Sequence, residues 1–224
     1  MATVGAEINS ANKYGRTPLY VASFSGHQKI VEYLTTVGAE VDRADNSGLT
    51  PLHVASINGH EMVAETLVTA GAKINSATNN GITPLYVAAI SGQEKVVKYL
   101  TTVGAEIDSA TNDGTTPLYA ASMKGHQKVV EYLATAGAEI NRAKANGATP
   151  LFIASHNGHN KVVEYLVTVG GEVNSATIDG ITPLYAASIN GHQKVVECLV
   201  TAGAEINSTT TEGRTPLYLS NIHI

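Results

Sequence analysis

The chain has 224 residues, a net charge of −5 and only 5% aromatic residues, with no tryptophan. Its mild negative charge argues against a nucleic-acid surface, which needs clustered basic residues. A single cysteine, Cys198, excludes an internal disulfide framework and indicates a reducing compartment, so we expect a cytoplasmic or nuclear protein. The start has no signal-peptide pattern and no apolar run reaches a membrane-spanning length, so we expect no membrane partner.

A phrase of six residues, Gly-x-Thr-Pro-Leu followed by an aromatic residue or His, recurs every 33 residues without insertion or deletion. Its copies begin at Gly15, Gly48, Gly81, Gly114, Gly147, Gly180 and Gly213. A fixed period of this length is typical of stacked-repeat proteins. Glycine permits a turn with positive φ, threonine can cap a helix, and proline suits the first helical position. Each copy therefore predicts a turn followed by the start of a helix.

The period divides the chain into a tail, six complete repeats and a partial repeat. Residues 1–11 are expected to be the tail of an incomplete N-terminal repeat, and residues 210–224 a partial C-terminal repeat. The six complete repeats between them are 12–44, 45–77, 78–110, 111–143, 144–176 and 177–209. In the fourth repeat, 117–124 is predicted as a first helix that Gly125 ends, and 126–135 as a second, amphipathic helix. A turn-rich connection follows over 139–146. Helices this short are marginal alone, so neighbouring repeats must cover them.

Several motifs together resemble the ankyrin repeat over essentially the whole chain. They are Thr-Pro-Leu, the Val-Val of the second helix, the closing Gly-Ala, and the pairs Gly26-His27, Gly59-His60, Gly125-His126, Gly158-His159 and Gly191-His192. The resemblance implies an all-α solenoid of stacked helix-turn-helix units with β-hairpin-like fingers. It also implies a non-catalytic protein-protein interaction module or scaffold, which binds a protein or peptide through its concave groove and finger tips without a cofactor.

Some positions depart from the ankyrin pattern. The His that usually follows Thr-Pro-Leu is kept only at His53, and the other repeats have Tyr or Phe. A tyrosine such as Tyr20 can use its hydroxyl in place of the imidazole, or its ring can simply pack. Gln93 replaces the His of a Gly-His pair. In the second helices, Lys29–Glu32 and its equivalents can form pairs three residues apart.

No pattern in the chain indicates catalysis or a metal site. Five histidines form one column at 33-residue spacing, so they lie on different layers and cannot converge on one zinc ion. Cys198 occupies the column of Tyr33, Tyr99, Tyr132 and Tyr165 and is interpreted as a structural filler. Lys194 can mildly activate its thiol, but no His and acidic partner are placed to make it a nucleophile. We expect no enzyme, no cofactor and no metal.

The columns that vary between repeats form the candidate partner-binding surface. In the ankyrin fold these columns lie on the concave face, and exposed apolar residues there indicate an interaction site. The candidates are Lys13, Tyr14, Arg16, Phe24, Leu49, Ile57, Ile82, Ile90, Met123, Lys124, His156, Ile178, Ile181 and Ile189. Alternatively, these side chains pack on adjacent repeats, and the chain is a structural spacer of a longer ankyrin array with no partner at this surface.

Two further expectations concern the asparagines and the ends. The resemblance makes Asn75, Asn141, Asn174 and Asn207 candidates for hydroxylation, although a hydrogen bond within the finger turn is the alternative role. Terminal repeats usually carry a polar outer face, but both ends of this chain are apolar, which predicts end-to-end self-association. The apolar residues concerned are Leu19, Ile30, Val31 and Leu34 at one end and Leu217, Tyr218, Leu219 and Ile222 at the other.

Overall fold

The computed structural model describes residues 7–213 and 215, and over these residues it contains twelve α-helices and no strand. The all-α fold expected from the sequence is therefore confirmed. The chain divides into two compact units, Met1–Ser109 and Ala110–Ile224. Among the described helices, none is both long and apolar enough to cross a bilayer. The partial C-terminal helix expected around Leu217 lies outside the described residues.

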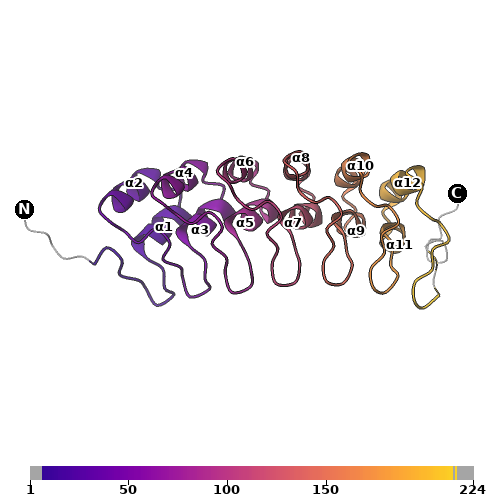
Figure 1. The fold of residues 1–224 in the computed structure, drawn as a ribbon, viewed down its shortest axis with the longest axis horizontal. Helices are drawn as coiled ribbons and strands as arrows, with labels where there is room; N and C mark the ends of the chain where they lie inside the picture. The colour runs from indigo at the N-terminus through magenta and orange to yellow at the C-terminus, as the bar shows by residue number, and fades with distance from the viewer. Residues whose placement is uncertain (1–6, 214, 216–224) are drawn as a thin grey trace, which may run out of the picture. The chain divides into compact units, whose positions relative to one another are not determined.

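Unit 1 consists of three helix pairs arranged in two layers. Its helices are α1 (Pro18–Phe24), α2 (Gln28–Thr36), α3 (Pro51–Ile57), α4 (Glu61–Thr69), α5 (Pro84–Ile90) and α6 (Glu94–Thr102). The first helices α1, α3 and α5 pack side by side in one layer, and the second helices α2, α4 and α6 in the other (Figure 1). The connections that follow the second helices project beyond the first-helix layer as fingers.

Unit 2 repeats the same arrangement with three further pairs. Its helices are α7 (Pro117–Lys124), α8 (Gln127–Thr135), α9 (Pro150–His156), α10 (Asn160–Thr168), α11 (Pro183–Ile189) and α12 (Gln193–Thr201). Here α7, α9 and α11 form the first-helix layer and α8, α10 and α12 the second. The two layers of each unit enclose its core.

Helix ends follow the repeated phrase. The Thr116 hydroxyl accepts a hydrogen bond from the Tyr119 backbone N–H at 3.1 Å, and Pro117 occupies the first helical position, as predicted. Gly125 ends α7 with a φ of 74°. The second helix begins one residue later than predicted, at Gln127, because His126 takes the N-cap position.

The core consists of mid-sized apolar side chains that face between the layers. In the fourth repeat, Leu118, Val129, Val130 and Leu133 are fully buried, and the same columns are buried in the neighbouring repeats. Burial of each such side chain contributes about 1.5–3 kcal/mol. Since α7 and α8 have only eight and nine residues, this burial rather than helix propensity stabilises them.

Side chains that bond to backbone groups connect successive repeats. The Asn141 amide oxygen accepts from the Glu172 N–H at 2.9 Å, and its NH₂ group donates to the Gly170 carbonyl at 3.0 Å. In unit 1, Asn75 makes the same two hydrogen bonds to the next repeat, with the Glu106 N–H and the Gly104 carbonyl. The expectation that these asparagines bond within their own finger turn is therefore wrong, because their partners lie about thirty residues further along the chain.

The Gly-His column forms a second connection between repeats. His159 bonds through Nε2 to the Met123 carbonyl at 3.0 Å, and Gln93, where His is replaced, donates to the Ile57 carbonyl at the same distance. The ring therefore reaches back to the end of the preceding first helix. The column therefore has a structural role, because it joins each repeat to the one before it.

Glu32 and Glu197, both on second helices, have different partners from those expected. Glu32 accepts from the Gln28 side chain at 2.8 Å, four residues earlier, instead of pairing with Lys29. Glu197 accepts in the same way from Gln193 at 2.9 Å. Side chains four residues apart are neighbours on a helix surface, so each of these contacts joins successive turns of one helix.

Candidate protein-binding surface

The structure divides the candidate residues into an exposed and a half-buried group. The exposed group comprises Lys13, Tyr14, Arg16 and Phe24 in unit 1 and Lys124, His156, Ile178 and Ile189 in unit 2. The half-buried group comprises Leu49, Ile57, Ile82 and Ile90 in unit 1 and Met123 and Ile181 in unit 2. The half-buried side chains thus serve packing as well as presenting part of their surface.

In unit 1, a buried carboxylate organises the first two fingers. Asp45 accepts a hydrogen bond from the Tyr20 hydroxyl at 2.9 Å, and the Arg16 Nε lies 3.6 Å from the same oxygen. Its other oxygen accepts from the backbone N–H groups of Ser47 and Leu49. Burial, followed by the hydrogen bond and the charge of Asp45, raises the pKa of Tyr20 to about 12.

The same arrangement supports an exposed aromatic ring. The Arg16 guanidinium lies 5.4 Å from the ring centroids of both Tyr14 and Tyr20, and the Lys13 ammonium lies 5.0 Å from that of Tyr14. Such cation–π contacts are worth roughly 0.5–1 kcal/mol at exposed sites. Tyr14 is 53% exposed and Phe24 54%. The unit 1 surface therefore combines aromatic rings with positive charge.

In unit 2, Lys144 occupies the repeat position of Asp45. Its ammonium lies 2.7 Å from the Asp113 carboxylate and 5.5 Å from the centroid of the Tyr119 ring. Hydrogen bonds from Lys144, then from Thr111 and Thr115, hold the pKa of Asp113 well below its usual range. The sequence reasoning missed Asp45 and Lys144. Every other member of their column is Asn or Thr, so these two residues could have been found in the sequence as its only charged members.

The isoleucines of unit 2 supply exposed apolar surface. Ile178, on a finger, is 71% exposed, although its backbone N–H is fixed by a bond to the Asn146 carbonyl at 3.0 Å. Ile181 lines a cleft of about 220 Å³ together with Asp179, Tyr185 and residues 210–212. Ile189, at the end of α11, is 52% exposed. Next to it, the Asn190 amide lies 3.2 Å from His156 Nδ1.

His53 is fully buried and has a purely structural environment. Its Nε2 bonds to the Ile82 carbonyl at 3.0 Å, and its Nδ1 accepts from the Thr50 N–H at 3.1 Å. These contacts require a neutral ring with its proton on Nε2. Burial lowers the pKa of His53 below 6.5.

Cys198, on α12, is the thiol of the chain. Burial, and then the charge of Glu164, raise the pKa of the Cys198 thiol, which is the opposite of activation by Lys194. Within the described part of the chain, no three His, Cys, Asp or Glu side chains are grouped so that they could hold a metal ion.

Comparisons with known proteins agree with this geometry. The family model described as ankyrin repeats (3 copies) matches residues 1–78, 64–144, 85–178, 141–210 and 170–221. The crystal structure of the human ASB11 ankyrin repeat domain is 27% identical, with 93% of each chain covered and a TM-score of 0.86. The ankyrin repeat domain of Bcl-3, described as a unique member of the IkappaB protein family, is 29% identical with a TM-score of 0.81. That match covers 93% of this chain and 96% of the Bcl-3 chain.

The comparison with curated proteins gives no match. The chain therefore belongs to the ankyrin-repeat family, whose fold is a general, non-catalytic module for protein–protein interaction.

Proposed function

We propose that this chain is a scaffold that binds a protein or peptide partner through its first helices and fingers. The observation that carries the proposal is the exposure of Ile178 and Ile189, at 71% and 52%. A column that only faces solvent would be polar, whereas exposed apolar side chains that gather on one surface mark interaction sites.

The two units offer different chemistry to such a partner. Unit 2 presents the isoleucines together with the polar His156, which suits apolar side chains of the partner. Unit 1 presents Tyr14 beside Lys13 and Arg16, and also the exposed Phe24, which suits an apolar segment that carries acidic residues. Aromatic residues and arginine are the types enriched among residues that dominate binding energy.

A photo-crosslinking experiment tests this surface. A photoreactive amino acid is introduced at Ile178 and, as a matched control, at Val200, which is 41% exposed on α12 in the second-helix layer. In native host cells we expect a protein partner crosslinked at 178 and not at 200. Ile178→Asp with Ile189→Asp should abolish capture by a crosslinker placed at the neighbouring position 179, whereas Val200→Asp should not. Capture that is absent, or equal at both positions, would support the spacer alternative.

We also propose self-association through the N-terminal side of unit 1. Ile30 and Tyr33 are exposed on α2, although the equivalents of Ile30 in later repeats, such as Val63, are buried. The prediction of an exposed end is only partly correct, because Leu19 and Val31 are buried. The residues expected at the other end, 217–222, lie outside the described part.

Sedimentation velocity tests the self-association. Ile30→Asp with Tyr33→Asp should shift the protein towards monomer at concentrations where the wild type associates, while Val200→Asp should leave the distribution unchanged. A wild type that stays monomeric at high concentration would refute the proposal.

A cytoplasmic location is a further proposal, supported by the single free thiol of Cys198 in place of any disulfide. Imaging of the tagged full chain in the native host tests it, and a secreted product would contradict it.

A further inference from the structure

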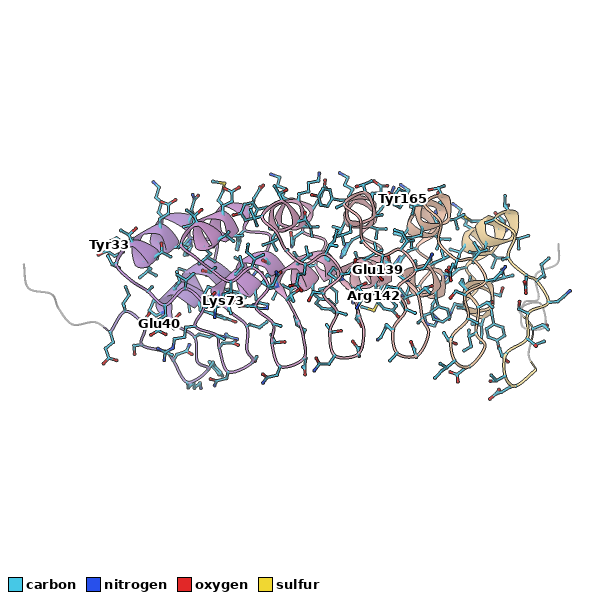
Figure 2. All side chains as sticks on the ribbon, in the orientation of Figure 1. Tyr33, Glu40, Lys73, Glu139, Arg142 and Tyr165 are labelled. Atoms are coloured by element: carbon cyan, nitrogen blue, oxygen red, sulfur yellow. The ribbon has the colours of Figure 1, made fainter. Side chains whose placement is uncertain are left out.

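One column of the second helices closes the groove between neighbouring repeats. It contains Tyr in four repeats but Thr66 in α4 and Cys198 in α12. Tyr165, labelled on α10 in Figure 2, shows what the tyrosine does. Its hydroxyl donates to the Glu131 carbonyl of α8 at 3.3 Å, so the ring lies across the groove between the two helices.

The other tyrosines of this column behave consistently. Tyr99 is half-buried, and its pKa is raised by burial and then by the charge of Glu65, which belongs to the preceding second helix. Tyr33, in contrast, is 66% exposed, because no described helix precedes α2 in that layer. The ring is therefore covered only where it has a preceding second helix to contact.

A cleft is present at each of the two places where this tyrosine is replaced. One, of about 530 Å³, lies between α2 and α4 and is lined by Thr66. The other, of about 590 Å³, lies between α10 and α12 and is lined by Cys198. The Thr66 cleft is bordered by hydroxyl and carboxylate groups, including Glu32 and Glu65. The Cys198 cleft has Val167, Cys198 and Ala202 among its lining residues.

We propose that the Cys198 cleft binds the phenol ring of a tyrosine side chain from a partner protein. The occupant is inferred from Tyr165, which fills the equivalent space one repeat earlier. A bound ring would pack on Val167 and Ala202, as an aromatic side chain does in a core. Its hydroxyl would donate to the Glu164 carbonyl, which is the equivalent of the Glu131 carbonyl that Tyr165 uses. The rim residue Lys194 adds a cation that can contact the ring face.

This site lies in the second-helix layer, whereas the surface proposed above lies on first helices and fingers. Failure of one proposal therefore leaves the other intact.

Binding is measured with N-acetyl-tyrosinamide as the probe and N-acetyl-phenylalaninamide as its matched control. In amide NMR spectra of the full chain, the tyrosine probe should shift the signals of Glu164, Thr168 and Cys198 at millimolar concentration. The phenylalanine probe should bind several-fold more weakly, since it cannot donate to the Glu164 carbonyl. Equal shifts from both probes, or no shifts, would overturn the proposal.

The only thiol of the chain gives a second readout. Alkylation of Cys198 by iodoacetamide should slow about twofold at a probe concentration equal to the dissociation constant. Free p-cresol serves as a further arm. If p-cresol protects the thiol and N-acetyl-tyrosinamide does not, the cleft takes free phenols rather than a peptide side chain, and the proposal is refuted.

Substitutions in the Cys198 cleft test whether the probe binds there. Cys198→Tyr should abolish the probe-induced shifts by filling the cleft from within, and Cys198→Ser should retain them. Thr66→Tyr, which makes the same change in unit 1, should leave binding at the Cys198 cleft unchanged. If Cys198→Tyr does not fold, Val167→Phe narrows the cleft from α10 instead. Shifts that persist in the filled variant would show that the probe binds elsewhere.

Discussion

His53 and Tyr20 occupy the same position in successive repeats but contact the next finger in different ways. His53 bonds to a backbone carbonyl, that of Ile82, whereas the longer Tyr20 side chain reaches the Asp45 carboxylate. Of the two roles considered for tyrosine at this position, Tyr20 therefore uses its hydroxyl. The histidine contact is independent of the neighbouring side chain, and the tyrosine contact is not.

Acid should destabilise the protein through His53. Because the pKa of His53 is lowered in the folded state, the unfolded chain binds a proton more readily, and stability falls as the pH drops below 6.5. The slope can reach about 1.4 kcal/mol per pH unit. In urea unfolding between pH 7.5 and 5, His53→Tyr should flatten this dependence. His159→Gln, which copies the natural Gln93, should retain it, and a flat wild-type curve would contradict the prediction.

Alkaline pH should destabilise the protein through Tyr20. Its pKa is raised to about 12 from 10.0, so its contribution to stability is complete below pH 10 and is lost as the pH rises towards 12. Tyr20→Phe should remove this alkaline loss. At pH 7 it should cost about 1–3 kcal/mol, because Asp45 loses a donor in a buried site. Tyr185→Phe is the control, and an equal cost in both variants would show that the Asp45 contact is unimportant.

At the scale of the element, the glycines that end first and second helices differ in what surrounds them. Both Gly125 and Gly137 have positive φ, of 74° and 98°. A Cβ at Gly125 would lie 2.6 Å from His159 Nδ1, whereas at Gly137 it would meet nothing within 4 Å. The glycine after a first helix therefore makes room for the next repeat, in addition to permitting the turn.

Alanine substitution separates these two effects. Gly137→Ala should cost about 1–2 kcal/mol from backbone strain alone. Gly125→Ala should cost more, because it also displaces the His159 ring and its bond to Met123. Thermal unfolding of both variants gives the comparison. A cost for Gly125→Ala no larger than that for Gly137→Ala would refute the role assigned to the contact.

The elements could be predicted from the sequence more completely than the contacts between them. Thr116, Pro117 and Gly125 act locally, so the bounds of α7 follow from the repeated phrase. The partners of Asn141 and the cleft at Cys198 could not be deduced, because both depend on the distance between repeats. Of the candidate site, the exposure of Ile178 agrees with its varied column, whereas Ile57 is half-buried by packing that no single-repeat pattern reveals.

At the scale of the whole molecule, stability should depend on position within the stack. Repeats contact mainly their neighbours, so a cavity is costly only where both sides are covered. Leu166→Ala, at a fully buried position, should cost about 2–5 kcal/mol. Leu34→Ala, at the equivalent but half-buried position of α2, should cost clearly less.

Hydrogen exchange and denaturant unfolding check this prediction together. Leu166→Ala should increase amide exchange more in unit 2 than in unit 1. Equal costs for the two substitutions, or exchange raised uniformly along the chain, would contradict the nearest-neighbour description.

The hydrogen bonds that Asn141 and His159 make between repeats have a consequence for how such a chain can evolve. Both side chains contact backbone atoms, which every repeat offers regardless of its residues. Recombination that adds or deletes a whole 33-residue unit therefore leaves these hydrogen bonds complete without a compensating mutation. Asp45 and Lys144 are different, because each depends on a particular side chain in the preceding repeat. Copy number can thus change at junctions that use only such backbone contacts, while junctions with a side-chain pair, such as these two, keep specific repeats together.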